Sequence, residues 1–231
     1  MTRGLDLAMY VRALPLYARN LGVLLPPLVA ALLAVGLTYF AAWFFAASGG
    51  AGAGLMGLLI NVIFGFAFGV SVIFADDAWR HDRANLPSAW SEARRKAGNI
   101  LIAVIGFLFV TWIARYIGGF LGGSIGGLAL GAIAVWAFIY TIPAAAMGGV
   151  PGGAALSASL QGAKREPLAT AILVIVCLVV WVGISVYGVA YLPFNEIGNI
   201  FATALLQAIA MGYMALVVAR QYSDLAFRPY F

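Results

Sequence analysis

Six long apolar stretches constrain this chain more than any other feature of its sequence. They lie near residues 21–47, 54–75, 99–117, 124–146, 168–192 and 198–219 and contain a single charged residue, Arg115. The hydrocarbon core of a bilayer is about 30 Å thick, so a helix needs about 20 apolar residues to cross it. The pattern predicts an all-α integral membrane protein with six transmembrane helices.

The sequence between these stretches is too short to form a separate soluble domain. Hydrophobic residues make up 64% of the 231 residues and charged residues 9%, whereas about a quarter of a soluble domain is charged. We therefore expect one polytopic membrane domain over residues 1–231. The first apolar stretch is longer than the core of about 7–15 residues in a signal peptide, so we expect the N-terminal segment to be retained. The single cysteine, Cys177, excludes an intrachain disulfide.

The distribution of basic residues predicts the orientation in the membrane. Arginine and lysine residues precede the first stretch, separate the second from the third and the fourth from the fifth, and follow the sixth. This topology leaves only Arg115 on the opposite side, and basic residues are enriched in cytoplasmic loops. Both termini, including the tail at 220–231, are therefore expected in the cytoplasm. The simplest location is the cytoplasmic membrane of a prokaryote.

Each odd-numbered stretch is preceded by a short segment with amphipathic character, which indicates three similar hairpins. The segments are residues 1–20, WSEARRKAGNILIAV and LQGAKREPLATAILV. Short helices in these positions would lie along the inner membrane surface with one face buried; ordinary loops are the alternative. Basic residues beside membrane helices attract anionic lipid head groups. We expect this role for Arg94, Arg95, Lys96, Lys164 and Arg165.

Small residues recur at every fourth position in several of the predicted helices. They are Gly65 and Gly69, then Gly119, Gly123, Gly127 and Gly131, and finally Ala204, Ala208 and Gly212. Small residues at this spacing allow two helix backbones to approach closely inside a membrane. We expect these positions to pack helices of one chain together, and a seam between two copies of the chain is the alternative.

The segment FADDAWRHDRANLP (residues 74–87) contains the candidate chemistry. Asp76, Asp77 and Asp82 resemble the acidic clusters that bind magnesium and diphosphate in membrane prenyl-transfer enzymes, and the only histidine, His81, lies beside them. Magnesium in such sites is bound by carboxylates together with substrate phosphates, and no other loop offers a second acidic cluster. We therefore expect the solvated end of a membrane helix, with Asp76 and Arg80 paired at i,i+4 spacing. No metal and no cofactor is expected.

Few polar side chains lie within the apolar stretches, where ionisable groups are costly and mark functional sites. Asn61 and Gln207 are isolated amides, and we expect them to form hydrogen bonds between helices. Arg115 and Glu196 are the two charges that this topology leaves on the outer side. They could pair across neighbouring hairpins, or Arg115 could extend to lipid phosphate.

The cytoplasmic segments and the C-terminal tail resemble those of a known domain family. The series ADDAWRHDRANLPSAWSEARRKAGNIL, TIPAAAMGGVPGGAALSASLQGAKREPLATAIL and YMALVVARQYSDLAF, with Tyr222, Asp224 and Leu225, is similar to the six-span membrane domain attached to some bacterial glycerophosphodiester phosphodiesterases. The resemblance covers most of the chain and implies a six-span architecture. The soluble catalytic barrel of those enzymes is absent, together with its histidine and glutamate residues, so the resemblance implies no activity.

Three functions are compatible with these features, of which we expect the first and keep the second as the main alternative. The first is a non-catalytic membrane component, such as an accessory subunit, assembly factor or scaffold, whose partners are membrane lipids and other membrane protein subunits and not nucleic acid. The second is a small permease for a lipid or hydrophobic solute, with helices kinked at Pro26, Pro27 or Pro143. The third is a membrane enzyme that uses the acidic segment. A continuous polar cavity would favour the permease, and an apolar outer face covered by a partner would favour the subunit.

Overall fold

The computed structural model describes residues 6–44, 50–184 and 196–226, and every regular element in these ranges is a helix. Four helical segments are long and apolar enough to cross a membrane, namely residues 21–44, 54–81, 97–146 and 199–225. A fifth is reached if residues 152–165 and 167–182, which meet at 109°, are counted as one span. The predicted helical membrane class is confirmed, whereas the described residues give four or five candidate spans and not six.

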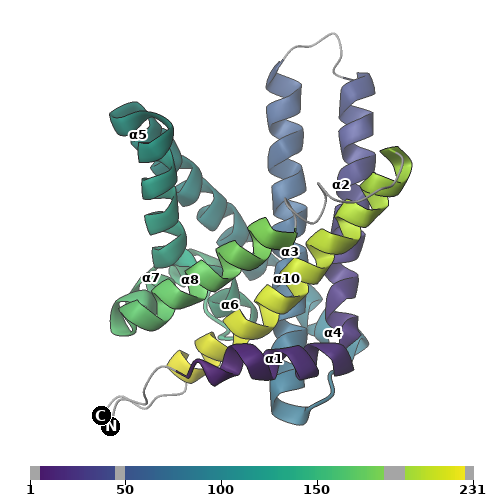
Figure 1. The fold of residues 1–231 in the computed structure, drawn as a ribbon, viewed down its shortest axis with the longest axis vertical. Coiled ribbons are helices and arrows are strands. Elements are labelled where there is room, and N and C mark those ends of the chain that lie inside the picture. The colour runs from purple at the N-terminus through teal and green to yellow at the C-terminus, as the bar shows by residue number, and fades with distance from the viewer. Residues whose placement is uncertain (1–5, 45–49, 185–195, 227–231) are drawn as a thin grey trace.

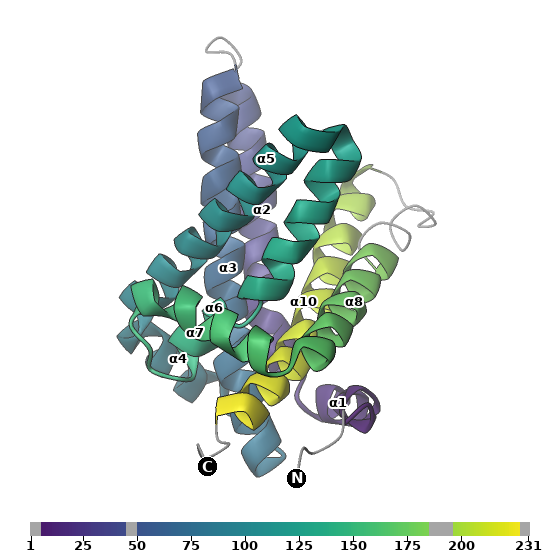
Figure 2. The ribbon, with the colours of Figure 1, turned by 90° about the vertical axis from the view of Figure 1, so that its left-hand side faces the viewer.

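The helices occupy nearly the whole of the described chain (Figures 1 and 2). In chain order they are α1 (Ala8–Arg19), the 3-10 turn η1 (Leu21–Leu24), α2 (Leu25–Phe44), α3 (Gly50–His81), α4 (Leu86–Arg95), α5 (Ala97–Phe138), α6 (Thr141–Ala146), α7 (Gly152–Arg165), α8 (Pro167–Val182) and α10 (Glu196–Ala226). Helices α2 and α3 stand side by side, α10 packs diagonally against both, α5 packs against α3, and α8 packs against α10. We call the end that contains α1 and α4 the polar end; it is the lower end in both figures.

Helix α5 contains a sharp reversal and accounts for one difference from the predicted spans. Gly122 and Gly123 leave the helical conformation, and Gly123 has a φ of 62°, a value that glycine adopts without steric cost. The chain therefore turns back, and two arms, residues 97–121 and 124–138, lie side by side (Figure 2). The two arms correspond to the separate apolar stretches near residues 99–117 and 124–146, although the segment counts as one candidate span.

The glycines of this hairpin do not all have the predicted helix-packing role. A Cβ atom on Gly127 would lie 3.1 Å from the Arg115 carbonyl oxygen, and one on Gly131 would lie 2.7 Å from Arg115 Cγ. These two positions therefore face the first arm. Gly119 has open space beside it, and Gly123 forms the turn itself. The closest approach involves Gly118 and Gly126, where a Cβ on either residue would overlap the carbonyl oxygen of the other.

The three segments that precede the long helices form the short helices α1, α4 and α7 and not loops. Each buries one face, which is formed by small residues in α4 and α7 and by Met9, Ala13 and Leu16 in α1. Their opposite faces are exposed, as expected for amphipathic helices that lie against a bundle. Trp90 of α4 packs edge-to-face against Phe66 of α3, with ring centroids 6.2 Å apart.

The prolines of the apolar stretches lie where helices begin. Pro26 and Pro27 are in the first turn of α2, directly after η1, and Pro143 is in the first turn of α6. The first turn of a helix does not use its N–H groups in intrahelical bonds, so proline is tolerated there. At the break before α6, the Tyr140 N–H instead donates to Ser159 Oγ of α7 at 3.0 Å. Ser159 thereby satisfies a buried backbone group that the break would otherwise leave unpaired.

Candidate functional site

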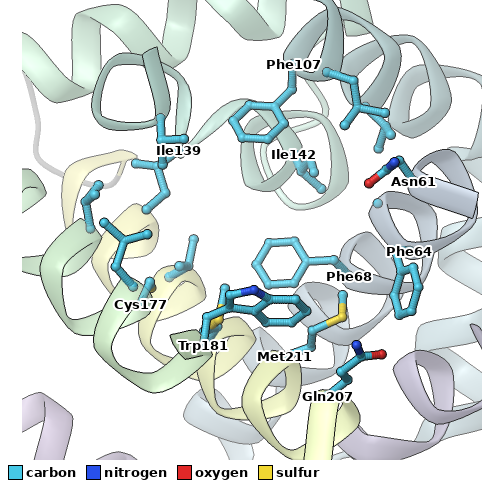
Figure 3. Close-up of a pocket in the computed structure, with 18 of the residues that line it drawn as sticks. Asn61, Phe64, Phe68, Phe107, Ile139, Ile142, Cys177, Trp181, Gln207 and Met211 are labelled. Atoms are coloured by element: carbon cyan, nitrogen blue, oxygen red, sulfur yellow. The ribbon is translucent and has the colours of Figure 1, made fainter. Parts of the chain in front are cut away.

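A cavity of about 410 Å³ lies between α3, both arms of α5, α6, α8 and α10 (Figure 3). Its volume falls within the range of about 300–1,000 Å³ that is usual for small-molecule sites. The lining residues are Ile60, Asn61, Phe64, Gly65, Phe68, Val104, Phe107, Leu108, Val135, Ile139, Ile142, Val174, Cys177, Leu178, Trp181, Gln207, Met211, Met214 and Val218. The reversal of α5 and the break before α6 bring the second arm back to this cavity, so the turn residues position part of its wall.

The wall of the cavity is apolar and contains no charged side chain. Four aromatic rings contribute to it, namely Phe64, Phe68, Phe107 and Trp181. Met211 and Met214 add flexible side chains that can adapt to ligands of different shape. Such a surface can bind a hydrocarbon chain, and it offers no general base, nucleophile pair or metal ligand set.

The cavity is closed toward the polar end and open toward the opposite end. Val104 and Val218, which lie nearest the polar end, are each 1% exposed. Farther along the helices, Leu178 of α8 is 45% exposed, and the Asn61 side chain is also exposed. The cavity is therefore accessible from the open end or from the side, because the packed core blocks the polar end.

The two amides that the sequence singles out both line this cavity. Asn61 lies fifteen residues before Asp76 in α3 and Gln207 thirteen residues before Arg220 in α10, so both are about 20 Å along their helices from the charged residues of the polar end. Asn61 Nδ2 donates to the Gly57 carbonyl oxygen at 2.7 Å within its own helix. The Gln207 side chain has no hydrogen-bond partner among the residues that the structure describes.

These contacts differ from the interhelical hydrogen bonds expected for the two amides. Asn61 bonds within α3, and Gln207 bonds to no described residue of a neighbouring helix. The physical reason is the cavity itself, which separates α3 from α8 and α10 at this level and leaves both amides facing open space (Figure 3).

The three aspartates of the acidic segment point to three different partners. Asp76 pairs with Arg80 at 2.8 Å and accepts a hydrogen bond from Ser223 Oγ at 3.0 Å. Asp77 contacts His81 Nδ1 at 2.8 Å. Asp82 pairs with Arg19 at 3.1 Å. The carboxylates therefore do not converge, and among the described residues there is no group of His, Cys, Asp and Glu side chains that could bind a metal ion.

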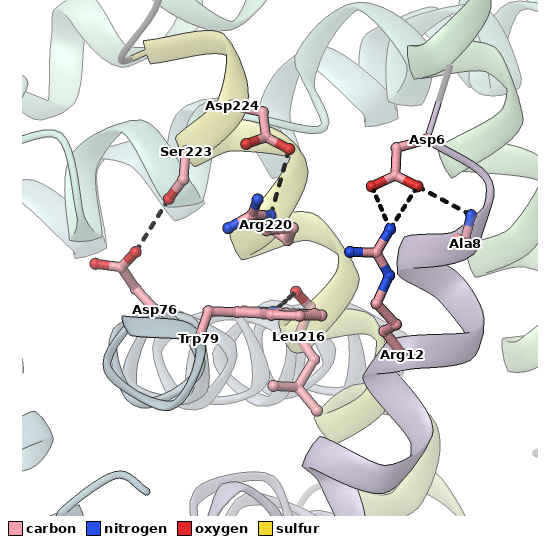
Figure 4. Close-up of polar contacts among 9 residues, drawn as sticks. All are labelled: Asp6, Ala8, Arg12, Asp76, Trp79, Leu216, Arg220, Ser223 and Asp224. Carbon is pink, nitrogen blue, oxygen red and sulfur yellow. Dashed lines mark hydrogen bonds and ion pairs between the residues drawn. The ribbon is translucent and has the colours of Figure 1, made fainter. Parts of the chain in front are cut away.

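The contacts around Asp76 form a joint between the polar ends of α3 and α10 (Figure 4). Trp79 Nε1 donates to the Leu216 carbonyl oxygen at 2.9 Å, and the Arg220 guanidinium lies 5.5 Å from the centre of the Trp79 ring. Arg220 also pairs with Asp224 at 3.4 Å. Together with the bond from Ser223 to Asp76, this joint ties α3 to α10 directly below the closed end of the cavity.

A buried asparagine that the sequence analysis did not identify connects α1 to the same region. Asn20 Nδ2 donates to the Leu16 and Asp82 carbonyl oxygens at 3.0 and 2.9 Å, and Asn20 Oδ1 accepts from the Ala84 N–H at 2.9 Å. Asn20 lies at the C-terminal end of α1, where a capping residue is expected. Its bonds to Asp82 and Ala84 join residues that are far apart in the sequence, so the sequence alone does not indicate them.

The predicted lipid-binding residues do not form a uniform set. Arg94, Arg95, Lys164 and Arg165 are exposed on the short helices α4 and α7. Lys96 is half-buried, donates to the Ala146 carbonyl oxygen at 2.7 Å and pairs with Glu92 at the same distance. Its ammonium group therefore satisfies the end of α6.

The remaining small residues pack against specific neighbours. A Cβ on Gly69 would lie 2.8 Å from Ile100 Cγ2, and one on Gly65 would overlap Val104, so α3 approaches α5 closely at both positions. Ala204 and Ala208 of α10 are buried. A Cβ on Gly212 would lie 3.0 Å from the Tyr17 ring, so α10 also approaches α1 closely.

The predicted outer pair involves a side chain outside the described residues. Glu196 is the first residue of α10, but its side chain is not among those that the structure describes. The Arg115 stem packs over Gly131 in the hairpin of α5, and its side chain is exposed. The pairing stays a prediction.

Comparisons with known proteins identify no relative. No family model matches the chain, and no curated protein sequence or solved structure is significantly similar to it. The resemblance to the membrane domain of glycerophosphodiester phosphodiesterases therefore also stays a prediction.

Proposed function

We propose that this protein binds a hydrophobic ligand, either a lipid or an apolar solute, in the cavity between α3, α5, α8 and α10, and that it is not an enzyme. The observation that supports this function is the cavity of about 410 Å³ with an apolar and uncharged wall. Of the functions compatible with the sequence, a carrier or permease for hydrophobic molecules requires such a site. A continuous polar cavity is the feature expected of a permease from the sequence. The cavity here is apolar instead, which suits a hydrophobic cargo and not an ion.

The proposed setting is the cytoplasmic membrane of a prokaryote, crossed six times. The three hairpins would be α2 with α3, the two arms of α5, and α8 with α10. The basic residues of α4, α7 and the chain ends support a cytoplasmic polar end, because such residues are enriched on that side. The cavity would then open toward the outer half of the bilayer.

A carrier would also need a second conformation. The polar end of the cavity is closed by packed side chains, including Val218 and Val104, so a ligand could leave toward that end only if helices moved apart. The joint between Trp79 and Leu216 links the two helices that would separate. Opening this joint is the step that distinguishes transport from binding alone.

A second function, that of an accessory subunit, is supported by the far end of the α5 hairpin. Phe120 is 86% exposed and Ile125 is 79% exposed, on either side of the turn at Gly122 and Gly123. A neighbouring membrane protein could cover these side chains, and so could lipid. The cavity gives the first function a defined site, which the hairpin does not.

The test of ligand binding compares two substitutions on the same helix. Val174→Phe adds a ring at the cavity wall, whereas Val179→Phe places the same ring on a side chain that is 65% exposed and does not line the cavity. Each protein is extracted in mild detergent, its folding is checked by size-exclusion chromatography, and the retained hydrophobic molecules are identified by native mass spectrometry.

We expect the unmodified protein and the Val179→Phe control to retain the same ligand and the Val174→Phe variant to lose it. Val135→Phe, on the second arm of α5, provides an independent cavity-filling variant if Val174→Phe does not fold. Equal retention by folded cavity-filling variants and the control would refute a ligand site in this cavity.

A further inference from the structure

We propose that the cavity selects a neutral lipid with one hydrocarbon chain and free hydroxyl groups, of the monoacylglycerol type. This inference rests on the proposed ligand-binding function and specifies its ligand. It follows from three properties of the site, namely the hydrogen-bonding state of the two amides, the absence of charge in the wall, and the closed end.

The amides require a ligand that donates hydrogen bonds. Asn61 Nδ2 already donates to the Gly57 carbonyl oxygen, so the group that remains for a ligand is chiefly the acceptor Oδ1. Gln207 has both its donor and its acceptor free of described partners. A hydroxyl group can donate to an amide oxygen and accept from an amide N–H, whereas an ester oxygen can only accept. A hydroxylated lipid therefore satisfies this pair better than an ester does.

The depth of the amides makes this requirement strong. In the proposed orientation, both lie about 20 Å from the charged residues of the polar end, within the hydrocarbon region. An amide without a hydrogen-bond partner is costly there, because lipid chains offer none. In the view of Figure 3, Asn61 and Gln207 lie on the same side of the cavity with Phe64 between them.

The uncharged wall excludes a charged head group at the level of the cavity. None of the lining residues is lysine, arginine, aspartate or glutamate. A carboxylate or phosphate placed there would lose its hydration without gaining a cationic partner, which is strongly unfavourable at low dielectric constant. The polar part of the ligand is therefore neutral.

The closed end sets the orientation and the number of chains. The cavity ends against Val104 and Val218, which are almost fully buried, and its volume of about 410 Å³ is in the lower part of the range for ligand sites. A single chain can therefore extend toward the polar end while its hydroxyl groups remain at the open end beside Asn61 and Gln207.

The experiment measures competition for the cavity by three lipids with the same acyl chain. A hexadecane that carries a diazirine is photocrosslinked to the full-length protein in nanodiscs, and the labelled peptides are identified by mass spectrometry. Monopalmitoylglycerol, methyl palmitate and palmitate are the competitors. They offer free hydroxyl groups, an ester alone, and a negative charge, respectively.

We expect monopalmitoylglycerol to compete at about tenfold lower mole fraction than methyl palmitate, which corresponds to two hydrogen bonds of ordinary net strength. The difference should fall to about threefold in Gln207→Leu and in Asn61→Leu, since each variant loses one of the two hydrogen bonds, and below about twofold when both substitutions are combined, while labelling of the cavity persists. Gln161→Leu, at an exposed position of α7 outside the cavity, should retain the full difference.

The outcomes separate this inference from the function on which it rests. If the diazirine probe labels no cavity peptide, or if no lipid competes, the proposed ligand-binding function is wrong and the ligand class fails with it. If methyl palmitate competes as well as monopalmitoylglycerol, the cavity binds hydrophobic chains but does not select hydroxyl groups. If palmitate competes best, the ligand is anionic and the neutral-lipid proposal is overturned.

Discussion

The contact between the two arms of α5 predicts that adjacent glycines differ sharply in their tolerance of alanine. A Cβ on Gly118 would overlap the Gly126 carbonyl oxygen and lie 2.7 Å from the Gly126 carbonyl carbon and 3.0 Å from the Gly127 Cα. All three atoms belong to the backbone, so no side chain can rotate away. Gly119 is the next residue of the same arm, and a Cβ there would meet no atom within 4 Å.

The expected magnitude follows from two opposing effects. Replacement of glycine by alanine inside a helix is favourable by about 1 kcal/mol, and both variants gain this term. Overpacking costs about 1–3 kcal/mol, and only Gly118→Ala incurs it. Because the overlap is with backbone, we expect the upper end, so that Gly118→Ala is about 3 kcal/mol less stable than Gly119→Ala.

Thermal unfolding in detergent or bicelles measures this difference. For a chain of this size, 1 kcal/mol corresponds to about 2–4 °C in Tm, so the two variants should differ by about 6–12 °C. Gly119→Ala should equal or exceed the unmodified protein. Equal Tm values for the two variants would show that the arms are not in contact and would refute the hairpin geometry.

Three further predictions concern the polar end. Trp79→Phe removes the hydrogen bond to the Leu216 carbonyl oxygen while retaining an aromatic ring, and it should lower the free energy of unfolding by about 1 kcal/mol. Trp90→Phe, at a half-exposed ring, is the matched control. An equal loss of stability in both variants would contradict the joint between α3 and α10. Simultaneous replacement of Asp76, Asp77 and Asp82 by asparagine should leave a folded protein that still retains its hydrophobic ligand, because the three carboxylates have separate partners. Loss of cellular function by a variant that is folded and still binds its ligand would favour the membrane enzyme. A cysteine at Ser91 in a Cys177→Ser background should react with an impermeant maleimide only after the cells are opened, because α4 is proposed to be cytoplasmic; labelling in intact cells would reverse the topology.

The class of the protein and its short helices follow from patterns that are local in sequence. Apolar length predicts helices that can cross a membrane, and spacing of small and apolar residues predicts that α4 and α7 bury one face. In the structure, the buried faces of these two helices contain Ala93 and Ala163. These features depend only on residues within one or two helical turns of each other, so a single sequence contains the information.

The contacts of the α5 hairpin could not be predicted in the same way. The pattern with a period of four selected Gly119, Gly123, Gly127 and Gly131, whereas the closest contact is between Gly118 and Gly126. These two residues lie four positions on either side of Gly122, where the chain reverses. In an antiparallel hairpin the contacts are symmetric about the turn, so they can be assigned only after the turn residue is known.

The cavity shows why the two membrane amides could be found but not interpreted from the sequence. An isolated amide in an apolar helix indicates that a hydrogen-bond partner is needed, but the sequence does not say whether that partner is another helix or a ligand. In the structure, Asn61 bonds within its own helix and Gln207 bonds to no described residue, and both line a space that no other part of the described chain fills. A bundle that only needed stable packing would gain from apolar side chains at both positions, since they would avoid the desolvation cost of an amide. The presence of both amides at one level of one cavity is therefore better explained by a polar group that enters from outside the chain than by packing within it.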